Sequence, residues 1–174
     1  NKLIFDSEKP RIGIISTGKS FLDTKLGLEK IGINKEVAND IGIKFLKIAM
    51  PWPLEETVIE KFAENLDKII VVEEKRSIIE TQVKEILFNK NLKVKVIGKK
   101  DENSNDLFVS SGALDPGEIG LKIYETIKYL KLPKDVTNFS MELKSLTEST
   151  NSNISLKRIP HFCSGCPHNT STRI

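Results

Sequence analysis

The sequence predicts an α/β fold, a three-layer αβα sandwich built around a mainly parallel sheet. The strongest observation is the unbroken β-branched run Ile69–Val72, which is typical of a strand buried on both faces. A second is the alternation of strand-like runs with helical apolar stripes between Arg11 and Leu130, as in repeated βαβ units. A third is the composition of the 174-residue chain, 39% hydrophobic and 29% charged, which is typical of a globular domain.

Strands and helix-start signals alternate along the chain. Strands are expected at Arg11–Thr17, Ile43–Met50, Lys68–Glu73 and Lys93–Ile97, with a short edge strand near Leu107–Val109. Helices are expected to begin near Ser20, Pro53, Ser77 and Asp115. Ser77 and Glu80 have capping-box spacing, and Asp115 precedes a first-turn proline, so both positions favour a helix start. The stretch Asn34–Gly42 has no such signal and is expected to be a short connector.

The composition divides the chain into four parts. Residues 1–10 are mostly polar and are expected to be a lead-in from a preceding domain, and residues 11–130 hold the alternating pattern of the αβα domain. Residues 131–160 are expected to be a linker, because residues 135–153 are rich in Ser, Thr and Asn and poor in apolar side chains. Residues 161–174 form a last part, which carries both cysteines.

Charge and hydropathy exclude several classes of protein. The net charge is only +3, with lysines scattered among glutamates, so nucleic-acid binding is not expected. No apolar run approaches the roughly 20 residues needed to span a membrane, and no signal peptide is visible at the start. Cys163 and Cys166 stand too close together for a disulfide framework. They favour a metal, cluster or redox role in a reducing compartment, and a cytoplasmic location is expected.

Residues 13–20, GIISTGKS, match the phosphate-binding loop pattern of nucleotide enzymes, but we reject this interpretation. The pattern requires a strand to end at its first glycine, whereas Ile14 and Ile15 are needed inside the first core strand. A strand, a tight glycine turn and a helix start explain the same residues. The pair Glu73–Glu74, which could pass for the acidic end of a second nucleotide motif, is expected to be a solvated or interface turn rather than an acid–base pair.

The segment Phe162–Asn169, FCSGCPHN, carries the strongest chemical signal. A C-x-x-C pair with an internal glycine puts two thiolates on one turn, which suits one edge of a zinc or iron–sulfur site. His161 and His168 flank the pair and could add ligands. A thioredoxin-type redox pair is a further alternative, although that motif should follow a core strand. Two free thiols are the structural alternative, and spacing alone does not separate these hypotheses.

Several of these stretches resemble the thiamine-diphosphate-dependent indolepyruvate:ferredoxin oxidoreductases, within the wider family of 2-oxoacid:ferredoxin oxidoreductases. The resemblance is carried in order by Ser16–Asp23 (STGKSFLD), Met50–Glu55 (MPWPLE), Ile69–Glu85, Ser110–Pro116 (SSGALDP) and Phe162–Arg173 (FCSGCPHNTSTR). The last motif is the most specific. Because the family enzymes are large and have several domains, the resemblance implies that the chain is an internal fragment.

The resemblance also implies a division of roles. Residues 11–130 would be similar to the transketolase C-terminal domain, which is mainly architectural, so no catalytic residue is expected there. Residues 161–174 would begin the thiamine-diphosphate-binding domain. Cys163 and Cys166 would ligate an iron–sulfur cluster of the full enzyme, and His168 would lie near the thiamine region.

The implied reaction is oxidative decarboxylation of an aryl 2-oxoacid to an acyl-CoA, with electrons passed to ferredoxin. The full enzyme would hold thiamine diphosphate, magnesium and the cluster, and the fragment none of them. Its partners would be the other domains of the enzyme, ferredoxin and CoA, and a dimer is a further expectation. A phosphate-loop nucleotide-binding protein and an interaction domain with a zinc-binding C-x-x-C tail remain the alternatives.

Overall fold

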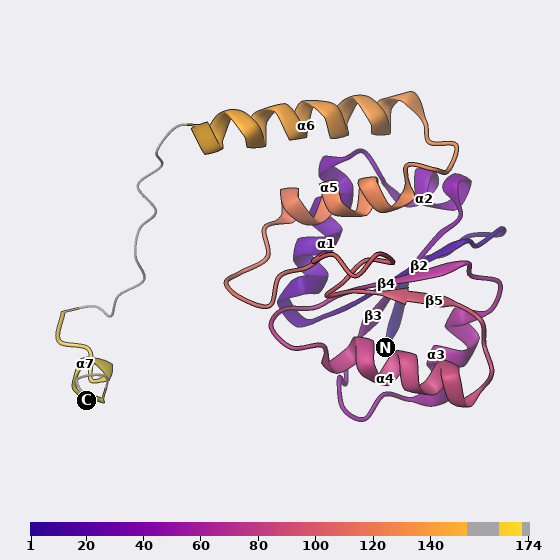
Figure 1. Cartoon of the computed structure of the whole chain (residues 1–174), viewed down its shortest axis with the longest axis horizontal. Helices are drawn as coiled ribbons and strands as arrows, with labels where there is room; N and C mark the ends of the chain where they lie inside the picture. The colour runs from indigo at the N-terminus through magenta and orange to yellow at the C-terminus, as the bar shows by residue number, and fades with distance from the viewer. Residues whose placement is uncertain (153–163, 172–174) are drawn as a thin grey trace. The chain divides into compact units, whose positions relative to one another are not determined.

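The computed structural model describes residues 1–152 and 164–171 (Figure 1). Five strands form one sheet in the order β1-β3-β2-β4-β5. Their bounds are Lys2–Phe5 for β1, Ile12–Thr17 for β2, Ile43–Ile48 for β3, Lys68–Val72 for β4 and Lys95–Ile97 for β5. β2, β3, β4 and β5 are parallel to one another, and only β1 is antiparallel. The mainly parallel sheet and its four parallel strands are therefore confirmed.

Helices cover both faces of this sheet, which confirms the three-layer αβα arrangement (Figure 1). The helices are α1 (Gly18–Lys30), α2 (Lys35–Ile41), α3 (Glu56–Ala63), α4 (Ile78–Asn89), α5 (Pro116–Ile127), α6 (Lys134–Ser152) and α7 (His168–Ser171). One apolar cluster joins the sheet to α1, α2 and α5, and a second joins it to α3 and α4. No helix in the described part of the chain has both the length and the apolar character of a membrane span.

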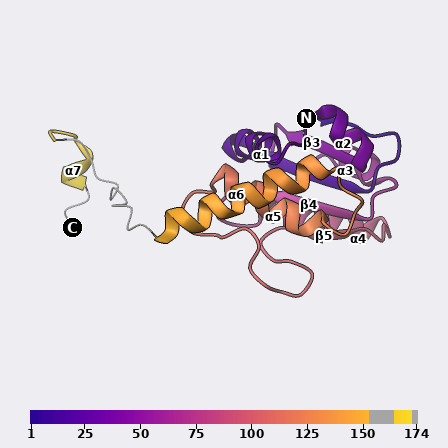
Figure 2. The ribbon, with the colours of Figure 1, turned by 90° about the horizontal axis from the view of Figure 1, so that it is seen from above.

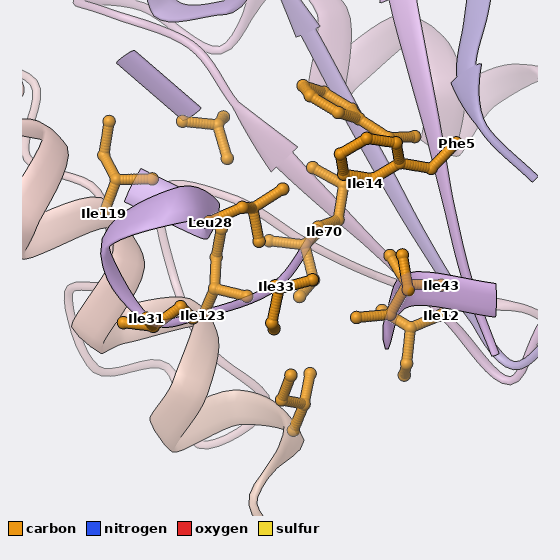
Figure 3. Close-up of a cluster of buried hydrophobic side chains, with 14 of the residues drawn as sticks. Phe5, Ile12, Ile14, Leu28, Ile31, Ile33, Ile43, Ile70, Ile119 and Ile123 are labelled. Atoms are coloured by element: carbon orange, nitrogen blue, oxygen red, sulfur yellow. The ribbon is translucent and has the colours of Figure 1, made fainter. Parts of the chain in front are cut away.

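β4 is an interior strand of the sheet, and its five residues are all buried. β4 pairs in parallel with β2 on one side and β5 on the other. Ile70 and Val72 belong to the α1–α5 cluster, whereas Ile69 and Val71 belong to the α3–α4 cluster. Figure 3 shows Ile70 among isoleucine and leucine side chains from β2, α1 and the turn that follows α1. Since side chains alternate across a strand, the β-branched run contributes to both cores at once.

The closest approach between helices is that of α1 and α5. A Cβ at Gly27 would lie 2.5 Å from the Pro116 carbonyl oxygen, and one at Gly120 would lie 2.5 Å from the Gly27 carbonyl oxygen. A side chain at either position would therefore push the two helices apart. Asp115 caps α5 as predicted, because its carboxylate accepts the amide N–H of Gly117 at 2.7 Å and that of Glu118 at 3.2 Å.

The fifth strand lies at the opposite edge from the one predicted. Residues 1–10, expected to be a lead-in, contribute β1, which pairs antiparallel with β3. Phe5 is buried and packs edge-on against Phe45, with ring centroids 5.8 Å apart, so the segment brings its own apolar anchor. The predicted strand near Leu107–Val109 is wrong. There the backbone makes only an isolated bridge between Lys100 and Asp106 and two further bonds, to Lys99 and Gly98.

Three helix boundaries also differ from the prediction. α1 begins at Gly18, whose φ of +53° turns the chain at once, so Ser20 lies buried inside the helix and is no cap. α3 begins at Glu56 rather than Pro53, because the Leu54 N–H is held at 2.9 Å by the Gln82 side chain of α4. The expected connector Asn34–Gly42 contains α2, which Asn34 caps by accepting the Val37 N–H.

The expected linker also contains regular structure, since α6 spans Lys134–Ser152. Val136 and Ser140 are buried, and Leu143 packs against the α1–α5 cluster from the same face of the helix. Spacings of four and three residues put these side chains on one helical stripe. The composition of this segment, rich in Ser, Thr and Asn, predicted a linker because so few apolar residues form the buried stripe. Figure 2 shows α6 beginning beside the helical layer of α1 and α5. The chain forms two compact units, residues 1–144 and residues 145–174, and we name the first the αβα module.

Candidate functional site

The carboxyl ends of β2, β3 and β4 lie together at one edge of the sheet, because these strands are parallel. The segments that follow them line a hollow of about 340 Å³. Its lining residues are Thr17, Gly18, Lys19, Ser20, Pro51, Trp52, Glu73, Glu74, Arg76, Ile78 and Ile79. In open α/β sheets this edge is where ligands and partners usually bind. Three of the stretches that carry the family resemblance meet here.

Glu73 and Glu80 are the two most buried charged groups described at this edge, each with 5% of its surface exposed. The Glu73 carboxylate accepts the amide N–H of Ile78 at 3.0 Å, that of Ile79 at 2.9 Å and that of Glu80 at 3.0 Å. Glu73 therefore caps the N-terminus of α4, where unpaired amides and the helix dipole favour an anion. The prediction that Glu73 is a solvated or interface turn residue is wrong. Ser77, the expected cap, makes no side-chain capping bond.

Lys19 does not act as the lysine of a phosphate loop. Gly13, Ile14 and Ile15 lie inside β2, so no loop surrounds a phosphate position there. The Lys19 ammonium lies 2.5 Å from an Asp23 carboxylate oxygen and 3.4 Å from a Glu74 carboxylate oxygen. The hydrogen bond to Asp23, reinforced by Glu74, raises the pKa of Lys19 above its ordinary value. The structure supports the rejection of the nucleotide interpretation.

Lys99 follows β5 and closes the same edge from the other side. Its ammonium donates to the Glu73 carbonyl oxygen at 2.5 Å, and its amide N–H donates to the Glu80 carboxylate at 2.8 Å. Desolvation lowers the pKa of Lys99, against the opposing attraction of Glu73 and Glu80. Sequence reasoning missed this lysine. Its signal was its place just after a predicted parallel strand, which brings it to the edge shared with Glu73.

The buried charged groups at this edge hold backbone in place rather than facing a reactant. Glu73 caps α4, Glu80 holds the turn after β5, and Lys99 ties that turn to the end of β4. All histidines and cysteines of the chain lie beyond residue 160. Within residues 1–152 and 164–171, no group of three or more His, Cys, Asp or Glu side chains gathers where it could hold a metal. The hydrogen bonds of Glu73, Glu80 and Lys99 at this edge thus link elements of the αβα module to one another.

The predicted ligand segment lies in the second compact unit. Cys163 falls outside the described residues. Gly165 has a φ of +79°, so the chain reverses just before Cys166, which is half-buried. The Asn169 N–H donates to the Cys166 carbonyl oxygen at 3.0 Å, and α7 begins at His168, an exposed residue. The turn is compatible with a C-x-x-C ligand pair, although such a pair supplies only half of a four-thiolate cluster site.

The fold and this edge define an α/β packing module whose buried polar groups serve its own backbone. A model of the indolepyruvate oxidoreductase domain matches residues 2–152, and the chain belongs to that family. The match ends before residues 161–174, which we call the cysteine segment. It covers the whole sheet and every helix except α7.

The relatives named indolepyruvate oxidoreductase subunit IorA extend the similarity. The protein of Thermococcus kodakarensis is 27% identical over 173 residues, which are 94% of this chain and 22% of the relative. The protein of Methanothermobacter marburgensis is 24% identical over 172 residues, 97% of this chain and 23% of the relative. The protein of Pyrococcus horikoshii is 33% identical over 92 residues, 53% of this chain and 13% of the relative. The chain thus spans less than a quarter of the length of these relatives.

Among solved structures, the chain is similar to 2-oxoglutarate:ferredoxin oxidoreductase from Magnetococcus marinus, solved with 2-oxoglutarate, coenzyme A and succinyl-CoA bound. The TM-score is 0.50 at 15% identity, and the match covers 72% of this chain and 19% of the solved one. At this identity the likeness concerns the fold alone. The family match and this likeness favour neither the nucleotide-binding alternative nor the zinc-tail alternative.

Proposed function

We propose that the chain is a noncatalytic, architectural part of a thiamine-diphosphate-dependent indolepyruvate:ferredoxin oxidoreductase. The observation that carries the proposal is the family match over residues 2–152, in relatives more than four times as long as the aligned segment. The absence of His and Cys from those residues supports it, because they leave the module without the side chains most used in redox and metal chemistry. The module's role is then to position other domains.

The cysteine segment would supply the residues of this chain that bind or approach the cofactors. We assign Cys163 and Cys166 as cluster ligands, and the turn at Gly165, just before Cys166, is compatible with this assignment. The alignment with the Methanothermobacter marburgensis relative covers 97% of the chain, so it extends well beyond residue 152 into this segment. His168, at the start of α7, is assigned to the thiamine region. Residues 161–174 would begin the thiamine-binding domain.

The cofactors would divide the reaction between them. Thiamine diphosphate, held with magnesium, would supply the decarboxylation chemistry, and the cluster would carry electrons toward ferredoxin. The substrate would be an aryl 2-oxoacid, CoA would take the acyl group, and the enzyme would work in the cytoplasm, with a dimer as its expected assembly. The chain's own contribution would be the two thiolate ligands and an architectural module.

A turnover assay tests this proposal. A polypeptide as long as the relatives, which we call the longer polypeptide, should oxidise indolepyruvate with thiamine diphosphate, magnesium, CoA and ferredoxin. The 174-residue chain should show no turnover under the same conditions. The Lys19→Ala variant of the longer polypeptide serves as the control and should keep its activity, since the Lys19 ammonium forms ion pairs with Asp23 and Glu74 of the module itself. Turnover by the 174-residue chain, or none by the longer polypeptide, would contradict the proposal.

A further inference from the structure

The carboxyl edge of the sheet exposes an apolar surface, which we call the Trp52 surface and define as Pro51, Trp52, Arg76 and Ile78. These residues line one hollow. Trp52 is 69% exposed and Ile78 is 51% exposed, although both are large apolar side chains. Trp52 is also the single tryptophan of the chain. Exposed tryptophan beside other apolar groups is typical of a surface that is covered in the assembled protein.

The charged side chains around this surface differ in whether they have partners within the module. Lys19 and Glu74 pair with each other, and Glu73 faces inward to cap α4. Arg76 is exposed and forms no ion pair with any residue in the described ranges 1–152 and 164–171. An exposed tryptophan next to an unpaired arginine has the composition of an interface hot spot, where Trp and Arg are both enriched.

We propose that the Trp52 surface is the face by which the αβα module docks onto another domain of the same oxidoreductase. This inference rests on the proposed function and names the surface that the architectural role uses. The docked domain should offer an apolar pocket for Trp52 and a carboxylate for Arg76. In the relatives of this chain, more than three quarters of the sequence lies outside the aligned segment. That remaining sequence would contain the domain that covers the Trp52 surface.

Charge argues against a second copy of the chain as the occupant. In a two-fold contact the same surface meets itself, so Arg76 and the neighbouring Lys75 would face the same cations of the other copy. Like charges across an interface are destabilising. A domain with a carboxylate at this position satisfies Arg76 without bringing these cations together.

Hydroxyl-radical footprinting tests the proposal, because it reads the solvent access of single side chains. Trp52 should be oxidised at least fivefold more slowly in the longer polypeptide than in the 174-residue chain. Phe88 is the matched control, since it is an 81% exposed aromatic at the other end of α4. Its oxidation rate should change by less than twofold.

Two variants of the longer polypeptide separate docking from folding. Trp52→Ala and Arg76→Glu should each raise the oxidation rate of Ile78 several-fold, whereas Phe88→Ala should leave it unchanged. Because both substituted side chains are exposed in the module, neither change should alter its fold. Unprotected Trp52, or protection that disappears on dilution and so comes from a second copy, would overturn the proposal. Protection without thiamine-dependent turnover would instead overturn the proposed function and leave the docking surface standing.

Discussion

The αβα module and the cysteine segment differ in what their polar groups do. In the module, the buried Glu73 and the partly buried Lys99 bind the backbone of the module itself. Around Cys166, residues 164–169 are exposed or half-buried, and they carry a thiol and an imidazole within three residues. Stability and reactive side chains are therefore separated along the chain. Changes in the module should alter folding, and changes in the segment should alter chemistry.

The largest expected effect on folding concerns β4, an interior strand whose residues are all buried. Ile70→Ala in the 174-residue chain should lower the free energy of unfolding by about 4 kcal/mol, because it leaves a cavity in a fully buried site between β2 and α1. Urea unfolding followed by circular dichroism measures this change. Ile78→Ala is the control, since Ile78 is half exposed, and should cost about 0.5 kcal/mol or less. Equal losses for the two variants would show that β4 is not buried in the core.

A smaller loss is expected at the cap of α4. Glu73→Gln should lower the free energy of unfolding by about 2 kcal/mol, because an amide offers one acceptor oxygen to three N–H donors and turns its own NH₂ toward the others. Glu74→Gln changes a partly exposed side chain that pairs with Lys19, and should cost about 0.5 kcal/mol or less. If the two substitutions were equivalent in urea unfolding, Glu73 would not be the cap.

The smallest expected effect is the pH dependence contributed by Lys99. Its folded-state pKa is lowered by desolvation, so the unfolded chain binds more protons between that lowered value and the ordinary value of 10.5. Stability contributed by this lysine should rise with pH across that window. Lys19 and Lys128, whose pKa values are raised, lose their contributions only as pH rises above 10.5.

Urea unfolding of wild type and Lys99→Met at several pH values below 10.5 checks this sign. The stability of wild type relative to the variant should increase with pH over the window. A decrease would mean that Glu73 and Glu80 dominate over desolvation at this lysine. The effect is small because Lys99 is only partly buried, so solvent screens its interactions.

The sequence predicted the elements whose signals are local and periodic. The run Ile69–Val72 and the cap at Asp115 lie where their residue types require. β1 and α6 were missed because each depends on distant partners: Phe5 packs on Phe45, and Val136 joins a cluster built mainly from earlier elements. Local propensity and composition do not predict contacts between residues that are far apart in the sequence.

The site was predicted less well than the fold, for a physical reason. Glu73 reaches α4 only because the chain turns back at Lys75, which has a φ of +57°. Capping-box spacing favoured Ser77 instead, since the pattern considers only residues adjacent to the helix start. The cysteine pair was visible from spacing alone, and its assignment to a cluster remains a prediction carried by the family resemblance.

Metal content in the longer polypeptide tests the separation of folding and chemistry most directly. Iron and acid-labile sulfide should fall to a small fraction of wild type in Cys163→Ala and Cys166→Ala, with ferredoxin reduction lost in parallel, because each change removes one thiolate ligand. Ser164→Ala, inside the same turn, and Lys99→Met, inside the module, should keep wild-type content. Normal iron, sulfide and ferredoxin reduction in either cysteine variant would contradict the account.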